Sequence, residues 1–114
     1  MNRGDIVIVD FSQSNPSAGV RPAVVIQNDR DNGRIQNTIV AQVTSNIRRA
    51  HEDTHLLIDQ THADWQQSGL RLASVVNTSN IPTVRQADIR HVIGSLSTAT
   101  MKLIDSCLRV ALEL

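Results

Sequence analysis

Two side chains suited to phosphate chemistry stand at the ends of segments that resemble β-strands. Arg21 begins the run 21–28, and Thr44 ends the run 38–44. Arginine carries a permanent planar charge that matches phosphate oxygens, and a threonine hydroxyl can donate to a phosphoryl oxygen. If the two strands pair antiparallel, the start of one lies beside the end of the other. We therefore expect both side chains in one pocket, although each also fits an ordinary surface or strand-end role.

Short β-branched segments bounded by turn residues predict the strands that must position this pair. Turn chemistry fills residues 12–20, which we expect to form a mobile loop, and Asn32-Gly33 predicts a tight turn. Residues 60–67 are expected to form a helical turn that ends at Gly69. The predicted strands are residues 5–11, 21–28, 38–44, 54–58, 72–76, 80–84 and 91–94.

The C-terminal segment changes period. Met101, Ile104, Leu108 and Ala111 fall on one face of a helix, and Ser97 is a suitable N-cap residue. Short strands closed by a single helix predict a mainly β fold with helices, a small twisted barrel with a C-terminal helix. We expect residues 1–114 to form a single domain.

Composition limits the classes of function. The formal net charge is zero, so a nucleic-acid ligand would have to be held by a few well-placed cations rather than by a general positive field. Lys102 is the only lysine, so the remaining cations are arginines. There is no apolar run of membrane-spanning length. The single cysteine, Cys107, fits a reducing compartment, and we expect a cytoplasmic protein.

Other candidate residues carry weaker signals. His51 and His55 are four residues apart, but no glutamate follows the first, so we expect solvated histidines and no metal or other cofactor. Trp65 is expected to pack on the core. A basic group near the C-terminal strands consists of Arg85, Arg90 and His91. It could form an edge of positive charge, or it could simply keep exposed strands from pairing with other chains.

Several motifs in sequence order give the chain a specific resemblance. Residues 3–7 (Arg-Gly-Asp-Ile-Val) and 19–29 (Gly-Val-Arg-Pro-Ala-Val-Val-Ile-Gln-Asn-Asp) resemble the opening of the MazF/PemK toxin family. Val43-Thr44-Ser45 resembles its second signature. The remaining similar stretches are residues 9–11, 74–76, 79–81, 83–84 and 93–97, followed by Met101, Asp105 and Leu108.

This resemblance implies an SH3-like barrel of the MazF/PemK/CcdB type and a homodimer that cleaves single-stranded RNA. It also implies a cognate antitoxin as partner, and it makes Arg21 and Thr44 the catalytic pair. The products would be a 2′,3′-cyclic phosphate and a 5′-hydroxyl, formed without a metal. We expect the dimer to form through the C-terminal helix and the first strand. The general base stays open, because arginine remains protonated.

Further residues are candidates for substrate binding. Ser45 follows the catalytic threonine, and Arg48 can bind phosphate just beyond it. Asn77, Ser79 and Asn80 lie where the resembled family contacts RNA, and their amides and hydroxyls suit readout of unpaired bases. The same three residues equally suit a turn that closes a strand.

Departures from the family pattern keep a second function open. Asn15-Pro16-Ser17 replaces a common Ser-Glu-Gln stretch, and Pro82 replaces a common arginine. The alternative is a non-catalytic binding module, either a CcdB-like poison of a protein target or a degenerate antitoxin binder. Retention of Arg21 and Thr44 favours the enzyme.

Overall fold

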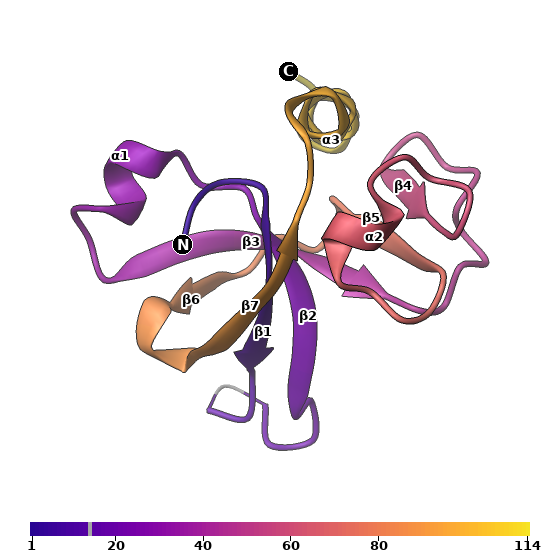
Figure 1. The fold of residues 1–114 in the computed structure, drawn as a ribbon. Helices are drawn as coiled ribbons and strands as arrows, with labels where there is room; N and C mark the ends of the chain where they lie inside the picture. The colour runs from indigo at the N-terminus through magenta and orange to yellow at the C-terminus, as the bar shows by residue number, and fades with distance from the viewer. Residues whose placement is uncertain (14) are drawn as a thin grey trace.

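The computed structural model describes residues 1–13 and 15–114, so Ser14, within the predicted loop, lies outside the described residues. The chain forms a strongly bent antiparallel sheet under one long helix (Figure 1). The strand order is β4-β5-β3-β2-β1-β7, and β6 pairs with β3 off this path. The strands are β1 (Asp5–Asp10), β2 (Val20–Val25), β3 (Asn37–Thr44), β4 (His55–Ile58), β5 (Ser74–Asn77), β6 (Thr83–Arg85) and β7 (Ile89–Ser95).

Closure of the barrel depends on β3. The first part of β3 pairs with β6, whereas its last part pairs with β5 and its middle with β2. The 3-10 helix η1 (Gln86–Asp88) then joins β6 to β7, which pairs with β1. The chain therefore passes from the β3 side of the sheet to the β1 side, and the sheet curls around the residues between them.

Each face of the sheet buries its own hydrophobic cluster, because neighbouring residues of a strand point to opposite faces. Ile6 and Val24 belong to the cluster beneath α3 (Thr98–Leu112), together with Ile104 of that helix. Val7 and Ala23, each one position away, belong to the cluster inside the curled sheet. This alternation fixes which face of β2 and β3 each side chain occupies.

The helix α3 follows its predicted pattern. Ser97 accepts a hydrogen bond from the Thr100 amide, as expected of an N-cap residue. Met101 and Ile104 are buried, and Leu108 packs against the same cluster. Within the described residues, no helix has both the length and the apolar character needed to cross a membrane.

The helix α2 (Trp65–Ser68) confirms the helical turn expected between the fourth and fifth strands. Gly69 ends it with a left-handed φ of 71°. A side chain there would collide with β7, since an added Cβ would lie 2.1 Å from the Ile93 carbonyl oxygen. Gly94 on β7 is equally close, because its added Cβ would lie 2.2 Å from the Gln67 oxygen. Two backbones thus touch where α2 meets β7.

One local prediction was wrong. Residues expected to form a tight turn at Asn32-Gly33 instead form the short helix α1 (Asp29–Asn32), with Gly33 at a φ of −86°. The Asn32 side chain is buried, where it donates to the Gln27 carbonyl oxygen and accepts from the Thr38 hydroxyl. These tertiary hydrogen bonds outweigh the local preference of the dipeptide for a hairpin turn.

The second strand is shorter than expected for a related reason. It ends at Val25 rather than Asn28, because the amides of Ile26 and Gln27 both donate to the Ile39 carbonyl oxygen. Two consecutive residues opposite one acceptor interrupt the ladder as a bulge does. The bend redirects the chain into α1.

Candidate active site

Arg21 and Thr44 lie on neighbouring strands at one end of the sheet. Ala23 is opposite Gln42, and Val24 is opposite Ala41. Continuing this antiparallel register by two residues brings Arg21 opposite Thr44. Residues directly opposite each other share a face of a sheet. The structure agrees with the expected common pocket, since both residues line one cavity.

This cavity has a volume of about 1080 Å³ and collects residues from distant parts of the chain. Its walls include the ends of β2 and β3, the loop after β1, the segment after α2 and part of β7. Phe11, Leu70 and Leu72 supply apolar surface. The polar and ionisable residues that line it are Asn15, Arg21, Gln42, Thr44, Ser45, Arg71, Ser74, Asn80 and His91.

The charge in this cavity is of one sign. The chain has 11 acidic and 11 basic residues, yet the lining contains two arginines and one histidine and none of the described carboxylates. Among the described residues, neither Arg21 nor Arg71 forms a salt bridge, whereas Arg3, Arg85 and Arg90 each pair with an aspartate. Cations without an internal counterion favour an anionic ligand.

Arg21 is exposed, and the loop before it orients its side chain. Its Nε donates to the Ala18 carbonyl oxygen at 2.8 Å. The backbone of Phe11 in turn donates to Gly19, which closes the loop near β2. A guanidinium group held at Nε still presents its two terminal nitrogens, a pair of donors that suits two oxygens of one phosphate.

Thr44 is half-buried at the end of β3. Its Oγ1 accepts a hydrogen bond from the Asn46 amide at 3.1 Å, which fixes the hydroxyl oxygen against the following turn. A hydroxyl that accepts one bond can also donate its hydrogen. Thr44 can therefore donate to an oxygen atom of an anion bound by Arg21.

The other predicted binding residues divide into two groups. Ser45 and Asn80 line the cavity. Asn77, Ser79 and Arg48 are not part of its lining. Asn77 accepts a hydrogen bond from the Ser79 amide and so forms the turn after β5, which is the structural role left open by the sequence.

Sequence reasoning did not single out Arg71 as a site residue. It follows Gly69 in the segment between α2 and β5, where no local pattern indicates a binding role. The backbone contact between Gly69 and Ile93 of β7 holds this segment beside the sheet. Only the close approach of two distant segments, which a single sequence does not reveal, brings Arg71 to the cavity.

Histidines outside the cavity do not gather into a metal site. The described residues contain no group of three or more His, Cys, Asp or Glu side chains placed to hold a metal. His51 is exposed, as expected, but the prediction that His55 is solvated was wrong. His55 is buried in β4, where its Nδ1 lies 2.8 Å from the Thr54 hydroxyl. This local hydrogen bond satisfies the ring nitrogen without water.

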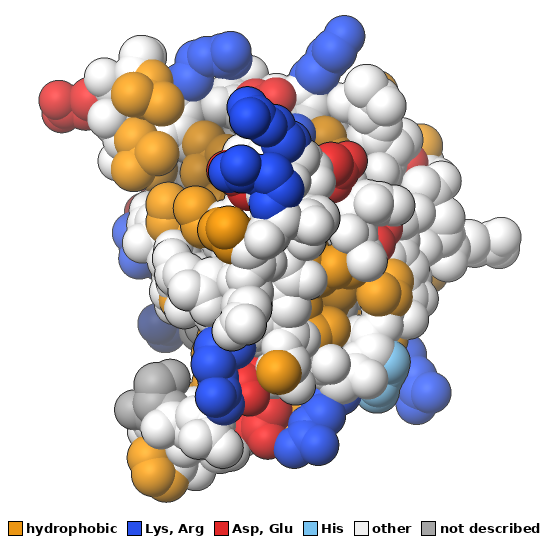
Figure 2. All heavy atoms as spheres, turned by 90° about the vertical axis from the view of Figure 1, so that its left-hand side faces the viewer, with side chains coloured by type: hydrophobic (Ala, Val, Ile, Leu, Met, Phe, Trp, Pro, Cys, Tyr) orange, Lys and Arg blue, Asp and Glu red, His pale blue; other side chains and the backbone are white. Residues whose placement is uncertain are grey.

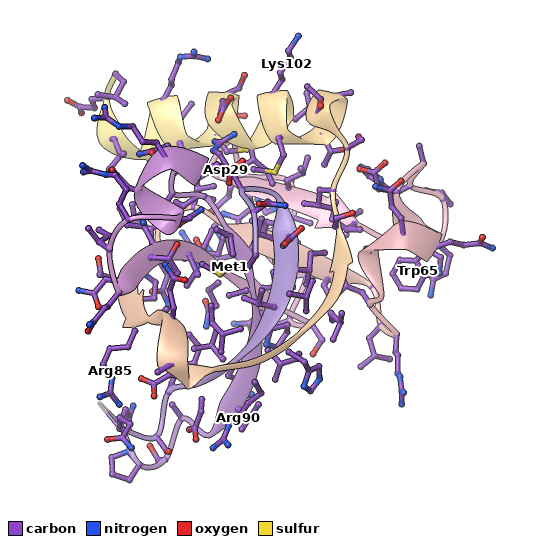
Figure 3. All side chains as sticks on the ribbon, turned by 60° about the vertical axis from the view of Figure 1, so that its left-hand side comes forward. Met1, Asp29, Trp65, Arg85, Arg90 and Lys102 are labelled. Atoms are coloured by element: carbon purple, nitrogen blue, oxygen red, sulfur yellow. The ribbon has the colours of Figure 1, made fainter. Side chains whose placement is uncertain are left out.

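The basic group near the C-terminal strands has separate roles for its members. Arg85 pairs with Asp88 and Arg90 pairs with Asp10, and both arginines project at the end of the barrel opposite α3 (Figure 3). His91 instead lines the cavity. Trp65 packs against the cluster under α3, as predicted.

A small antiparallel barrel that is covered on one face by a C-terminal helix, with a cation-lined cavity at the ends of two central strands, defines the class of helix-capped small β-barrels. The family model described as PemK-like, MazF-like toxin of type II toxin-antitoxin system matches residues 2–112. The chain belongs to this toxin family.

Individual relatives agree with this assignment. The chain is 30% identical to Endoribonuclease MazF of Staphylococcus saprophyticus, over all of this chain and 92% of the relative. A solved mycobacterial endoribonuclease in complex with its cognate antitoxin has the same fold, with a TM-score of 0.81 and 22% identity over 100% of this chain and 96% of that one. MazF of Deinococcus radiodurans is also similar, with a TM-score of 0.76 and 18% identity over 100% of this chain and 97% of that one.

Proposed function

We propose that this protein is an endoribonuclease toxin that cleaves single-stranded RNA without a metal ion and leaves a 2′,3′-cyclic phosphate and a 5′-hydroxyl. The observation that carries the proposal is the cavity that Arg21 and Thr44 both line, with a second arginine and none of the described carboxylates. The named activity of the staphylococcal relative supports the same reaction.

The reaction uses a nucleophile that RNA already contains. The 2′-hydroxyl attacks the adjacent phosphorus atom, negative charge grows on the phosphorane oxygens, and the bond to O5′ breaks. Arg21 stabilises that growing charge, and Thr44 donates to a phosphoryl oxygen and so orients it for in-line attack. Preorganised donors of this kind are each worth roughly 3 kcal/mol of transition-state stabilisation. The chemistry requires positioning and charge rather than a metal-bound hydroxide.

The lining also favours a single-stranded substrate. Phe11, Leu70 and Leu72 offer apolar surface, which unstacked bases can contact and bases inside a duplex cannot. Ser45 and Asn80 supply hydroxyl and amide groups that can read base edges. We propose that these residues, rather than Asn77 and Ser79, contact the bases beside the cleaved bond.

The test is cleavage of a long, unstructured RNA in the presence of EDTA. Wild type is expected to give discrete fragments whose 5′ ends are hydroxyls. Arg21→Ala should lower the cleavage rate by about 10²–10³-fold, and Thr44→Val should also lower it, because the hydroxyl is lost while the β-branched shape is kept. Arg30→Ala, an exposed arginine of α1 outside the cavity, is the matched control and should cleave normally.

Three results would each contradict part of this proposal. Loss of cleavage in EDTA would refute the metal-free mechanism. Cleavage that survives both cavity substitutions would place the reaction elsewhere. Intact RNA with folded wild-type protein would favour the non-catalytic binding module.

We also propose a homodimer and a cognate antitoxin as partner, with all of residues 1–114 acting as one cytoplasmic domain. The antitoxin proposal is supported by the mycobacterial relative, which was solved in complex with its own antitoxin. An acidic, flexible antitoxin segment would find two unpaired arginines in the cavity and would exclude RNA by occupying it. The side chains of Ile6, Val7 and Val9 on β1 are fully buried within one protomer. Of the two elements expected at the dimer contact, we therefore propose α3 rather than β1.

A further inference from the structure

His91 joins the cavity through the pairing of three strands. On β7 it lies opposite Ile8 of β1, and Ile8 lies opposite Pro22 of β2. Adjacent strands are about 4.8 Å apart, so this row spans about 10 Å and ends at Pro22, the residue after Arg21. Neighbouring strand residues point to opposite faces, so the cavity takes His91 from one face of the sheet and Arg21 from the other. All of these residues line the same cavity, and the His91 side chain is exposed.

The chemistry of the lining leaves one group suited to proton transfer. Serine, threonine and amide side chains are poor bases, and guanidinium groups remain protonated at physiological pH. Imidazole is the side chain whose ordinary titration falls between pH 5 and 8. Among the described residues that line the cavity, His91 is the only imidazole, and no carboxylate competes with it.

The charged groups around His91 are themselves poor proton acceptors. Arg21 of β2 and Arg71 of the segment after α2 are the other ionisable residues of the lining. Arg90, the preceding residue on β7, pairs with Asp10 at the end of β1 at 2.5 Å. Hydrogen bonds from the Ser12 hydroxyl and amide, and then from Arg90, lower the pKa of Asp10 from 3.8 to about 2. A carboxylate held so firmly ionised is a weak base.

We propose that His91 is the proton-transfer residue of the cleavage reaction, an inference that rests on the endoribonuclease function proposed above. The neutral imidazole takes the proton from the 2′-hydroxyl as the bond from O2′ to phosphorus forms. The bond from phosphorus to O5′ then breaks, and the imidazolium returns the proton to O5′ directly or through water. One proton leaves O2′ and one reaches O5′, so the step balances without a further reactant.

The test compares wild type with His91→Gln across pH 5 to 9. Glutamine is polar and similar in reach, but it does not transfer protons at these pH values. We expect kcat to fall by about 10²–10⁴-fold with little change in KM, and we expect the acid limb of the wild-type rate profile to disappear. His51→Gln, an exposed histidine outside the cavity, is the matched control and should keep both the rate and the profile.

A second variant separates chemistry from structure. His91→Ala should be inactive alone, and added imidazole should restore part of its kcat, which a structural defect would not allow. Circular dichroism and the thermal midpoint of each variant check that it is folded. Wild-type rates in His91→Gln with an unchanged pH profile, beside a slow Arg21→Ala, would overturn the role of His91 and leave the endoribonuclease intact. Intact RNA with wild type would overturn both proposals.

Discussion

Arg71 gives the cavity a second arginine that the sequence analysis did not include. A single arginine near the start of β2 would hold one phosphate, but Arg71, from the segment between α2 and β5, adds a second cation to the same cavity. Neither belongs to a salt bridge among the described residues, so both charges are available to an incoming polyanion. Two such groups suit successive phosphates of one strand, one at the cleaved bond and one beside it.

We predict that Arg71→Ala raises KM with little change in kcat, since this residue contacts a phosphate that does not react. Each phosphate contact on single-stranded nucleic acid contributes about 0.7 to the slope of log affinity against log salt concentration. The slope measured by fluorescence anisotropy, with a substrate whose attacking 2′-hydroxyl is replaced by hydrogen, should therefore decrease by about that amount.

Two further variants test whether the position of the charge or only the net charge determines binding. Arg71→Lys keeps the charge and should keep most of the salt dependence. Arg109→Ala removes an exposed arginine from the last turn of α3 that is not part of the cavity lining, and should leave KM unchanged. An equal effect of Arg109→Ala and Arg71→Ala would show that net charge alone, not position, determines binding.

At the scale of elements, Asp64 joins α2 to the start of α3. Its carboxylate is only 4% exposed and accepts hydrogen bonds from the Ser97 amide at 2.8 Å and the Ser97 hydroxyl at 2.9 Å. A carboxylate at a helix N-terminus also interacts favourably with the helix dipole. Burial by itself would raise the pKa of Asp64, but hydrogen bonds from Thr100 and Ser97 outweigh it and lower the pKa below 3.8.

We predict that Asp64→Ala lowers the free energy of unfolding by about 2–3 kcal/mol near pH 7, because hydrogen bonds to a charged group are lost. A lowered carboxylate pKa stabilises the folded state above the unfolded pKa of 3.8, and this contribution is lost as the pH falls through the folded-state value. The difference between wild type and variant should therefore shrink below about pH 4. Urea unfolding at several pH values measures it.

Asp53→Ala is the matched control, since Asp53 is exposed and belongs to none of the salt bridges of the described residues. Its effect on unfolding should stay within about 0.5 kcal/mol. A destabilisation by Asp64→Ala that does not depend on pH would mean that packing, rather than the ionised carboxylate, is responsible.

Periodicity predicted the elements well where local sequence and tertiary packing agree. The alternation along residues 38–44 predicted β3, which the structure extends by one residue to Asn37–Thr44, and the stripe from Met101 to Leu108 predicted α3. The helix α1 was missed because the buried hydrogen bonds of Asn32 to Gln27 and Thr38 come from tertiary structure.

The candidate site was predictable only in part, for the same physical reason. Arg21 and Thr44 end neighbouring strands, so antiparallel pairing alone predicts that they meet. Arg71 and His91 reach the cavity because β7 pairs with β1 and because α2 packs against β7. Those contacts join segments far apart in the chain, and no residue pattern near either side chain indicates them.

At the scale of the whole molecule, α3 leaves large hydrophobic side chains exposed on its outer face. Leu103 and Val110 are each 52% exposed, and Leu114 is 83% exposed. Leu103 and Val110 are seven residues apart and so lie on one side of α3, and Leu114 follows the left-handed residue Glu113 that ends the helix. Figure 2 shows hydrophobic side chains gathered toward the top of one face, at the height of α3. An exposed apolar stripe of this kind suits contact with a second copy of the chain.

We predict that Leu103→Glu combined with Val110→Glu converts the proposed dimer to a monomer, because charges would have to be buried in the contact. Sedimentation velocity over a range of concentrations measures the change in mass. Lys102→Glu, an exposed change of charge beside the stripe, is the control and should leave the dimer intact. An unchanged mass in the double variant would place the contact on another surface.

Because β3 pairs with three other strands, its register determines both the packing of the two hydrophobic clusters and the placement of Thr44. Because the strand is shared with β2, β5 and β6, a slip of one residue would turn Thr44 away from Arg21 and would at the same time expose Val40 and Ala41 to the wrong faces of the sheet. A register that separates Thr44 from Arg21 therefore also disrupts the packing of both hydrophobic clusters, and the loss of that packing disfavours it. A molecule that survives cellular proteolysis is, for that reason, a molecule whose reactive groups are already in register.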